Sequence, residues 1–300
     1  MDSIIDLGDI QPDIYEQLGT KPKFWFEHPV FGKCLCKSVR PDTGEDWSEV
    51  VAAGIAERLG LPHAEYKYAR YKGQRAVLTP TILPDLTALI LGNELLTHLD
   101  PTYKEGVQSS TQVAHTVHLV MQLLDHVRAP KTSNSYPTPV GSAADVFAGY
   151  LAFDALIGNT DRHHANWGIV IGPEAEVRLA PTFDHASSLG CHENDDRRAL
   201  RLVGKDRNFT VASFASKAGS GFYDDTALSK RVSTIDAFAT ACAMRTTVAQ
   251  GWLDRIASLA EEDFVELIAK VPTPLISETA RLFAVELLKE NQRRLAALRE

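Results

Sequence analysis

The chain has 300 residues, 44% of them hydrophobic and 23% charged, an ordinary globular composition that allows one large domain or two lobes sharing a cleft. Its formal net charge of -8 would repel nucleic acid and anionic lipid, so we expect neither direct nucleic-acid binding nor membrane association. The N-terminal MDSIIDLGDI has no basic segment ahead of an apolar one, and no apolar run is long enough to span a membrane. These features favour a cytoplasmic protein that is not exported.

Residues 1–84 are predicted to form a small β-rich lobe with one helix. FWFEHPVFGKCLCKSV contains two short runs of aromatic, Cys and Val residues around the turn HPVFG, which indicates a hairpin. In GEDWSEVVAAGIAERLGLP the apolar residues recur at helical spacing, Asp46 is placed to cap the start, and Gly60 with Pro62 should end the helix. Two more strands, AEYKYARY and QRAVLTP, are expected around Lys72 and Gly73. The cysteines, with no C-x-x-C pair, are expected to be reduced thiols: Cys34, Cys36, Cys191 and Cys242.

Residues 85–300 are predicted to form a larger, mainly helical lobe. Helical apolar spacing occurs in TALILGNELLTHL, in VAHTVHLVMQLLDHV and in VFAGYLAFDALIG. It returns near the end of the chain in residues 229–259, 262–271 and 277–298. The intervening residues 157–225 are expected to be mostly irregular, and a loop of that length in a compact domain is usually functional or disordered.

A small β-rich lobe ahead of a larger helical lobe is the layout of ATP-dependent phosphotransferases. Phosphoryl transfer needs a carboxylate that orients the acceptor and oxygen ligands for Mg²⁺. Asp161 and Asn166 are five residues apart, which is the spacing of the catalytic Asp and the metal-binding Asn in protein kinases. An apolar strand, a Gly-Pro turn and a second strand then lead to Asp184, a second candidate ligand for Mg²⁺. The fold class is therefore predicted to be α+β, in a bilobal protein-kinase-like fold.

Two stretches carry a family resemblance. GNTDRHHANWGIV followed by LAPTFDHASSLG closely resembles the C-terminal kinase region of the HipA-like serine/threonine kinases, whose best-known members are toxins of bacterial toxin-antitoxin systems. The resemblance implies that Asp161 is the catalytic base, that His163 belongs to the same loop, and that Asn166 and Asp184 hold Mg²⁺. It also implies ATP and Mg²⁺ as cofactors, a protein substrate with a Ser or Thr acceptor, and an antitoxin or other neighbouring-gene product as a partner.

The N-terminal lobe should then supply the residues that contact the ATP phosphates. LGTKPKFWF looks like a reduced phosphate loop, in which Gly19 allows close approach of the backbone and Thr20 and Lys21 contact phosphate. CLCKSV resembles the β3 strand of kinases, and Lys37 shares a face with Leu35 that we expect to line the cleft.

Two assignments in this lobe have rivals. Lys33 lies on the same strand face as Lys37 and competes with it for the phosphate-binding role. Glu49, twelve residues after Lys37, is expected to form an ion pair with it, but Asp46-x-x-Glu49 is also the pattern of a capping box, in which Glu49 would only bind a backbone N–H group.

Three alternatives stay open on the sequence alone. The pattern Asp-Arg-His-x-x-Asn is equally that of phosphoinositide 3- and 4-kinases, so a lipid or small-molecule acceptor is an open alternative. A catalytically silent nucleotide-binding scaffold is the third option, against which the intact Asp161, Asn166 and Asp184 argue. The toxins are usually longer, with an extra N-terminal subdomain, so this chain is expected to be a kinase-only member. The serine-bearing loop on which some of the toxins autophosphorylate is not seen in the sequence, and Thr20 or the SST at 109–111 are candidate substitutes for it.

Overall fold

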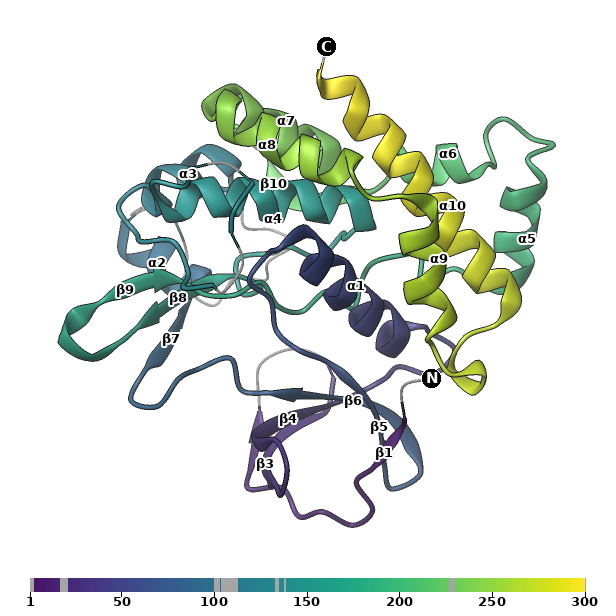
Figure 1. The fold of residues 1–300 in the computed structure, drawn as a ribbon, viewed down its shortest axis with the longest axis horizontal. Helices are drawn as coiled ribbons and strands as arrows, with labels where there is room; N and C mark the ends of the chain where they lie inside the picture. Colours follow the sequence, from purple (N-terminus) through teal and green to yellow (C-terminus); the bar gives the residue numbers. More distant parts are fainter. Residues whose placement is uncertain are drawn as a thin grey trace.

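The computed structural model describes residues 3–16, 21–99, 103, 113–132, 135–137, 139–226 and 230–299. It confirms the predicted α+β architecture: a β-sheet lobe from the N-terminal part of the chain lies below a larger lobe that contains most of the helices (Figure 1). Within the described residues, no helix combines the length and the apolar character needed to cross a bilayer. All four cysteines are free thiols.

The N-terminal sheet has six strands in the order β1-β5-β6-β4-β3-β2. Both predicted hairpins are present, β3 pairing with β4 and β5 with β6, and only β1 runs parallel to its neighbour. Alternate side chains of β3 and β4, including Phe24, Phe26, Cys34 and Cys36, are buried in one core beneath the sheet. The strands are β1 (Ile5–Asp6), β2 (Ile14–Glu16), β3 (Lys23–His28), β4 (Gly32–Ser38), β5 (Lys67–Tyr71) and β6 (Gln74–Pro80).

Helix α1 (Glu45–Leu59) connects the sheet to the helical lobe. It ends at Gly60, which adopts the left-handed conformation that closes many helices, as the sequence predicts. The prediction that Asp46 caps the helix is wrong, because the N-cap is Gly44, with no side-chain cap, and Asp46 instead binds the guanidinium of Arg75. Apolar residues of α1, among them Trp47 and Ile55, belong to the same hydrophobic core as the helices of the larger lobe.

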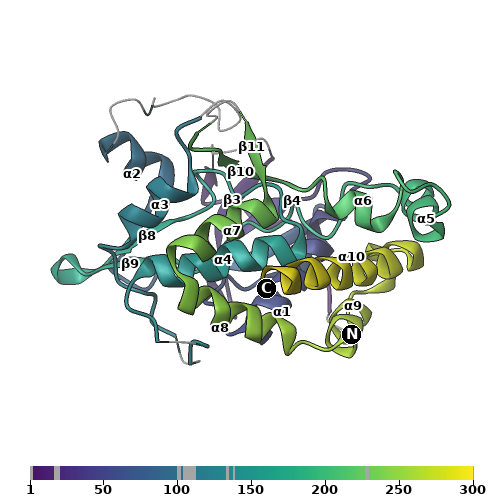
Figure 2. The same ribbon diagram turned by 90° about the horizontal axis from the view of Figure 1, so that it is seen from above.

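The larger lobe is built around helix α4 (Ala143–Ile157), every residue of which is buried. Figure 2 shows α4 running through the middle of this lobe with other helices alongside it, and α4 packs directly against α3, α7, α8 and α10. The other helices are α2 (Gly92–Leu99), α3 (Val117–Leu124), α5 (Asp195–Val203), α6 (Val211–Ala215), α7 (Thr234–Met244), α8 (Thr246–Ala257), α9 (Glu261–Ala269) and α10 (Glu278–Ala296). Short 3₁₀ turns occur at Pro173–Ala175, Thr273–Leu275 and Ala297–Arg299.

Two expectations for this lobe need correction. The segment 87–99 is not one helix, because its first part is the strand β7 (Ala88–Leu91), which pairs with β8 (Gly168–Ile171) far away in the sequence. This non-local pairing overrides the local helical spacing. The region 157–225 is also less irregular than predicted, since it contains β8, the predicted second strand β9 (Val177–Leu179), α5, α6 and β10 (Gly219–Tyr223), which pairs with β11 (Arg231–Ser233).

Candidate active site

A buried lysine lies at the centre of the cleft between the lobes. Lys37 Nζ is 2.6 Å from Glu49 Oε1 and 3.1 Å from Asp184 Oδ1, so strand β4, helix α1 and the segment after β9 meet at one cation. The expected contact between Lys37 and Glu49 is present, and Glu49 is therefore not the backbone-binding partner of a capping box. The ammonium also lies 5.1 Å from the ring centroid of Tyr66.

The charged groups of this cluster shift one another's pKa values. Burial by itself lowers the pKa of Lys37, but the carboxylates of Asp184 and Glu49 outweigh burial and hold it well above its usual value. Burial likewise favours the neutral form of Asp184, yet Lys37, with Lys21 and Lys23, brings the pKa of Asp184 below its usual range. For Glu49 burial dominates, and its pKa is raised. Lys37 and Asp184 are consequently a charged pair at neutral pH.

The loop from Asp161 to Asn166 follows α4 directly. Gly158 ends that helix in the left-handed conformation, and the loop then folds back on itself. Asn166 Nδ2 donates to the carbonyl oxygen of Asp161 at 2.7 Å, and His163 Nε2 lies 3.8 Å from Asp161 Oδ1. The Asp161 carboxylate is 53% exposed, so an acceptor in the cleft has access to it. Partial burial raises the pKa of Asp161, an effect that His163 opposes and Asp184 reinforces.

A buried ion pair holds this loop against α4. Arg162 is 1% exposed and donates to both carboxylate oxygens of Asp154, from Nε at 2.7 Å and from Nη2 at 2.8 Å. Its Nη1 donates to the carbonyl oxygen of Asn166 at 2.9 Å, which connects the two ends of the loop. Asn159 Nδ2 also donates to Asp154 at 2.9 Å. Asp154 therefore holds the loop from Asp161 to Asn166 in place without itself lining the cleft.

Strand β10 packs against the same loop, and at Gly221 the two backbones lie close together. A Cβ atom on Gly221 would lie 2.3 Å from the carbonyl oxygen of Arg162, so any larger residue there would displace the loop.

Asp184 sits at a bend in the backbone that points its side chain at Lys37. Its φ is +60°, in the left-handed region that Asp tolerates better than most residues. Its N–H donates to the hydroxyl of Tyr66 at 2.9 Å, and two residues earlier Thr182 makes a parallel bridge to His63. Contacts from the N-terminal part of the chain thus fix the segment that carries Asp184.

A cavity of about 220 Å³ opens beside this cluster. Its polar end is formed by Lys37, Asn166 and Asp184, and most of the remaining wall is apolar. A cavity with an apolar wall and a few convergent polar groups is the usual form of a small-molecule site. The apolar lining, suited to a flat aromatic base, consists of Trp25, Leu35, Ala64, Ile82, Leu89, Leu91 and Phe183.

The donor atoms at the polar end fit a hard divalent cation. Asn166 uses its Nδ2 within the loop, which leaves Oδ1 as the end available to a cation. In the described part of the chain, Asp184 binds Lys37 through Oδ1, and its second oxygen makes no hydrogen bond. One carboxylate and one amide oxygen are ligands that Mg²⁺ accepts, with waters and phosphate oxygens completing the shell.

The other residues that the sequence suggested for phosphate binding do not all lie at this cluster. Lys21 lies near the cluster, 3.1 Å from Glu45 Oε1, whereas Gly19 and Thr20 fall outside the described residues, as does the SST at 109–111. Lys33 is exposed, and its Nζ lies 5.2 Å from the ring centroid of Trp25. Lys37, unlike Lys33, is accordingly joined to two carboxylates.

Sequence reasoning missed three residues of this site. Lys23 and Tyr66 line the cavity, and Asp154 braces the loop. Strand alternation in KFWFEH would have placed Lys23 on the face of Trp25. A lone carboxylate in the apolar run VFAGYLAFDALIG would have indicated a buried partner for Asp154.

Comparisons with known proteins agree with this geometry. The family model described as HipA-like C-terminal domain matches residues 17–263. The fold is similar to the crystal structure of the Helicobacter pylori proinflammatory kinase CtkA, with a TM-score of 0.73 and 20% identity over 99% of this chain and 96% of that one. It is also similar to HipA in the Shewanella oneidensis toxin-antitoxin complex of HipA, HipB and operator DNA, with a TM-score of 0.54 and 14% identity over 96% of this chain and 66% of that one. A search of curated proteins found no match.

Proposed function

The chain belongs to the family of the HipA-like C-terminal domain, and we propose that it is an ATP- and Mg²⁺-dependent kinase that phosphorylates Ser or Thr residues of a protein. One observation carries the proposal: Lys37 is held between Glu49 at 2.6 Å and Asp184 at 3.1 Å at the polar end of an apolar cavity. Active protein kinases need this lysine–glutamate pair and the metal-binding aspartate in place together. The cluster has that arrangement here.

Each residue of the site has a role in this proposal. Lys37 would bind the α- and β-phosphates, and Asn166 with Asp184 would hold Mg²⁺, which neutralises charge on the phosphates when bound. Lys21, with Gly19 and Thr20, which lie outside the described residues, would contact the phosphates. Glu49 orients Lys37 without touching the nucleotide.

Asp161 would act on the acceptor hydroxyl. Its carboxylate accepts the hydroxyl hydrogen and orients the oxygen toward the γ-phosphoryl group, and His163 lies close enough to favour its charged form. Arg162 and Asp154 keep the loop in place while this occurs.

A protein partner and a cellular location complete the proposal. The Shewanella HipA was crystallised with HipB, so we include an antitoxin or another product of a neighbouring gene as a partner of this chain. The net charge of -8 favours the cytoplasm over a membrane surface.

Nucleotide binding should be visible as thermal stabilisation. A ligand that binds only the folded state stabilises it by about 2.7 kcal/mol at a hundredfold excess over Kd, so ATP with Mg²⁺ should raise the melting temperature. Asp184→Asn should remove most of the Mg²⁺-dependent part of the shift, because a carboxylate ligand becomes a neutral amide. The exposed Asp206→Asn is the control and should leave the shift unchanged. An equal shift in EDTA and in Mg²⁺ would contradict the assignment of the metal ligands.

The acceptor can be identified with labelled ATP. We expect the purified chain to transfer label to Ser or Thr of itself or of a protein in a bacterial lysate. Asp161→Asn should abolish the transfer and leave the melting temperature nearly unchanged, because this side chain is 53% exposed and Asn has nearly the same size and shape. Label in extracted phosphoinositides, with none in protein, would replace the protein-kinase proposal with a lipid kinase. Binding of ATP with label in neither fraction would favour a small-molecule acceptor or a silent scaffold.

A further inference from the structure

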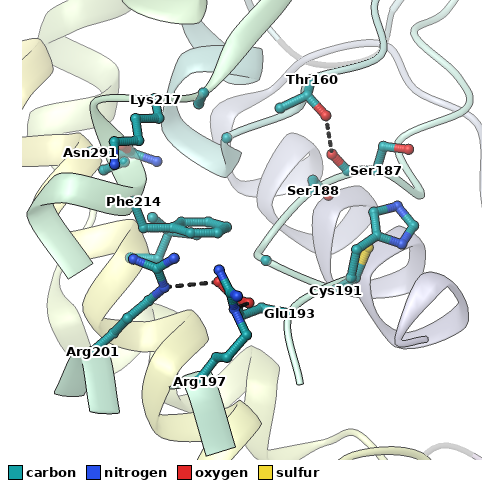
Figure 3. Close-up of a pocket in the computed structure, with 16 residues that line it drawn as sticks. Thr160, Ser187, Ser188, Cys191, Glu193, Arg197, Arg201, Phe214, Lys217 and Asn291 are labelled. Atoms are coloured by element: carbon teal, nitrogen blue, oxygen red, sulfur yellow. Dashed lines mark hydrogen bonds and ion pairs between the residues drawn. The ribbon is translucent and has the colours of Figure 1, made fainter. Parts of the chain in front are cut away.

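A second cavity, of about 410 Å³, lies beside the catalytic loop and outside the nucleotide site. One wall contains Thr160, the residue before Asp161, and Ser187, three residues after Asp184. The rest of the wall comes from α5, α6, the residues just after α6 and α10, and Figure 3 labels Arg197, Arg201, Phe214, Lys217 and Asn291 among them. Because Thr160 adjoins Asp161, anything bound here would lie close to an acceptor hydroxyl positioned by that carboxylate.

Two arginines of α5 line this cavity, and both bind the carboxylate of Glu193. Arg201 Nε donates to Glu193 Oε2 at 2.8 Å, and Arg197 Nε donates to the other oxygen of Glu193. Figure 3 shows both guanidinium groups beside Glu193 at the edge of the cavity. In the described part of the chain, the terminal nitrogens of these two arginines make no hydrogen bond. Each guanidinium group is therefore bound through its Nε–H, and its terminal N–H groups are available to a ligand.

Arg201 is the more buried of the two. It is 8% exposed, and its guanidinium carbon lies 3.8 Å from the ring centroid of Phe209 and 5.0 Å from that of Phe214. These rings fix its plane. Its Nη1 is buried and has no hydrogen-bond partner, an arrangement that is costly for a charged donor unless an acceptor arrives. The rings thus hold the guanidinium in one orientation, with a donor that the protein itself leaves unpaired.

The charges on the cavity wall indicate which anion fits. The lining includes Arg197, Arg201 and Lys217 against the single carboxylate of Glu193, an excess of two positive charges. Lys217 is exposed, and the described residues place no carboxylate in an ion pair with it. A phosphomonoester carries nearly two negative charges at neutral pH and offers three acceptor oxygens, whereas a carboxylate would balance only one cation. Paired arginine forks are also suited to bidentate phosphate binding.

We propose that this cavity binds a phosphorylated Ser or Thr of the protein substrate, close in sequence to the residue that receives the new phosphoryl group. The inference rests on the proposed kinase function and narrows its substrate class to proteins that are already phosphorylated nearby. Glu193 is a positioning residue, because it orients the two arginines and does not itself contact the phosphoryl group.

The first test measures binding without catalysis. The full chain carrying Asp161→Asn is titrated, without ATP, into fluorescent degenerate peptides that have phosphoserine, Asp or Ser at one fixed position. Phosphoserine peptides should bind about tenfold tighter than Ser peptides, as expected for charge-assisted hydrogen bonds to a buried arginine. Equal binding of phosphoserine and Ser peptides would overturn the site, and equal binding of phosphoserine and Asp peptides would overturn the phosphoryl assignment.

Matched variants locate the effect. Arg201→Gln should abolish the preference for phosphoserine, and Arg207→Gln, which removes an exposed arginine outside the cavity, should retain it. Since Arg201 is buried, a loss of folding by this variant is checked by its melting temperature. Arg197→Gln and Lys217→Gln change exposed side chains and provide the same test in a folded chain. Together they remove two of the three cations of the cavity, so the double variant should bind phosphoserine peptides more weakly, and an unchanged preference would contradict the proposal.

The second test separates this inference from the kinase proposal. The unmodified chain is given ATP, Mg²⁺ and peptides with a free Ser acceptor and a phosphoserine placed at each of the neighbouring positions in turn. One or more positions should raise kcat/KM by about tenfold over the unphosphorylated peptide. Transfer with no such preference would overturn the inference and leave the kinase standing. Preferential binding with no transfer to any peptide would count against the kinase and leave the anion site standing.

Discussion

Lys37→Ala should lower the rate of phosphoryl transfer about a hundredfold to a thousandfold, as found when one preorganised charge-stabilising donor is removed from an active site. The chain should stay folded, because Glu49 already has a raised pKa and can take up a proton when its cationic partner is gone. The measurement is transfer of labelled phosphate under saturating ATP, together with the melting temperature of each variant.

Lys33→Ala is the matched control for this prediction. Lys33 lies on the same strand face as Lys37, but it is exposed, and in the described structure its Nζ lies 5.2 Å from the ring centroid of Trp25 and forms no ion pair with a carboxylate. Its removal should leave transfer nearly unchanged. If the two variants ranked in the opposite order, the phosphate-binding lysine would be Lys33 and the role proposed for the Lys37 cluster would be lost.

Asp154→Ala should cause the largest loss of stability among the variants considered. It leaves the guanidinium of Arg162, which is 1% exposed, without its bidentate partner. Breaking a buried ion pair by removing one side typically costs about 3–5 kcal/mol. For a chain of this size the melting temperature should fall by roughly ten degrees. Transfer should also be lost, because the loop that carries Asp161 and Asn166 loses its attachment to α4.

Two companion variants make this prediction specific. Asp254→Ala breaks the ion pair with Arg299, in which both side chains are more than a third exposed, and should hardly change the melting temperature. Asp154→Ala combined with Arg162→Met removes both buried charges and should recover part of the lost stability, since an apolar side chain tolerates burial. Transfer should remain absent in the double variant. Full activity of the Asp154→Ala variant would contradict the proposal that Asp154 holds the loop in its active position.

Local patterns in the sequence determined the secondary-structure elements and the order of the candidate site residues. The hairpins, α1 and its end at Gly60, and the buried helix α4 follow from strand alternation, helical spacing and turn residues. The spacing of Asp161 and Asn166, with Asp184 after a β-hairpin, predicted the loop and the candidate metal site because those residues lie close together in the chain. Such features depend on interactions over a few residues, which a single sequence displays directly.

Contacts between distant segments were decided only by the tertiary structure. Asp46 fits a cap locally, but Arg75 on β6 offers its buried carboxylate a charged partner, which is worth more than one backbone hydrogen bond. The strand β7 exists because β8 pairs with it across the lobe, and no local pattern distinguishes it from the start of α2. Helix α5 escaped prediction because arginines, rather than apolar residues, form its buried stripe, and their partners Glu193, Phe209 and Phe214 become neighbours only on folding. The choice of Lys37 over Lys33 depended on the same kind of contact, since Glu49 and Asp184 come from separate elements, α1 and the segment after β9, and meet the lysine only in the folded chain.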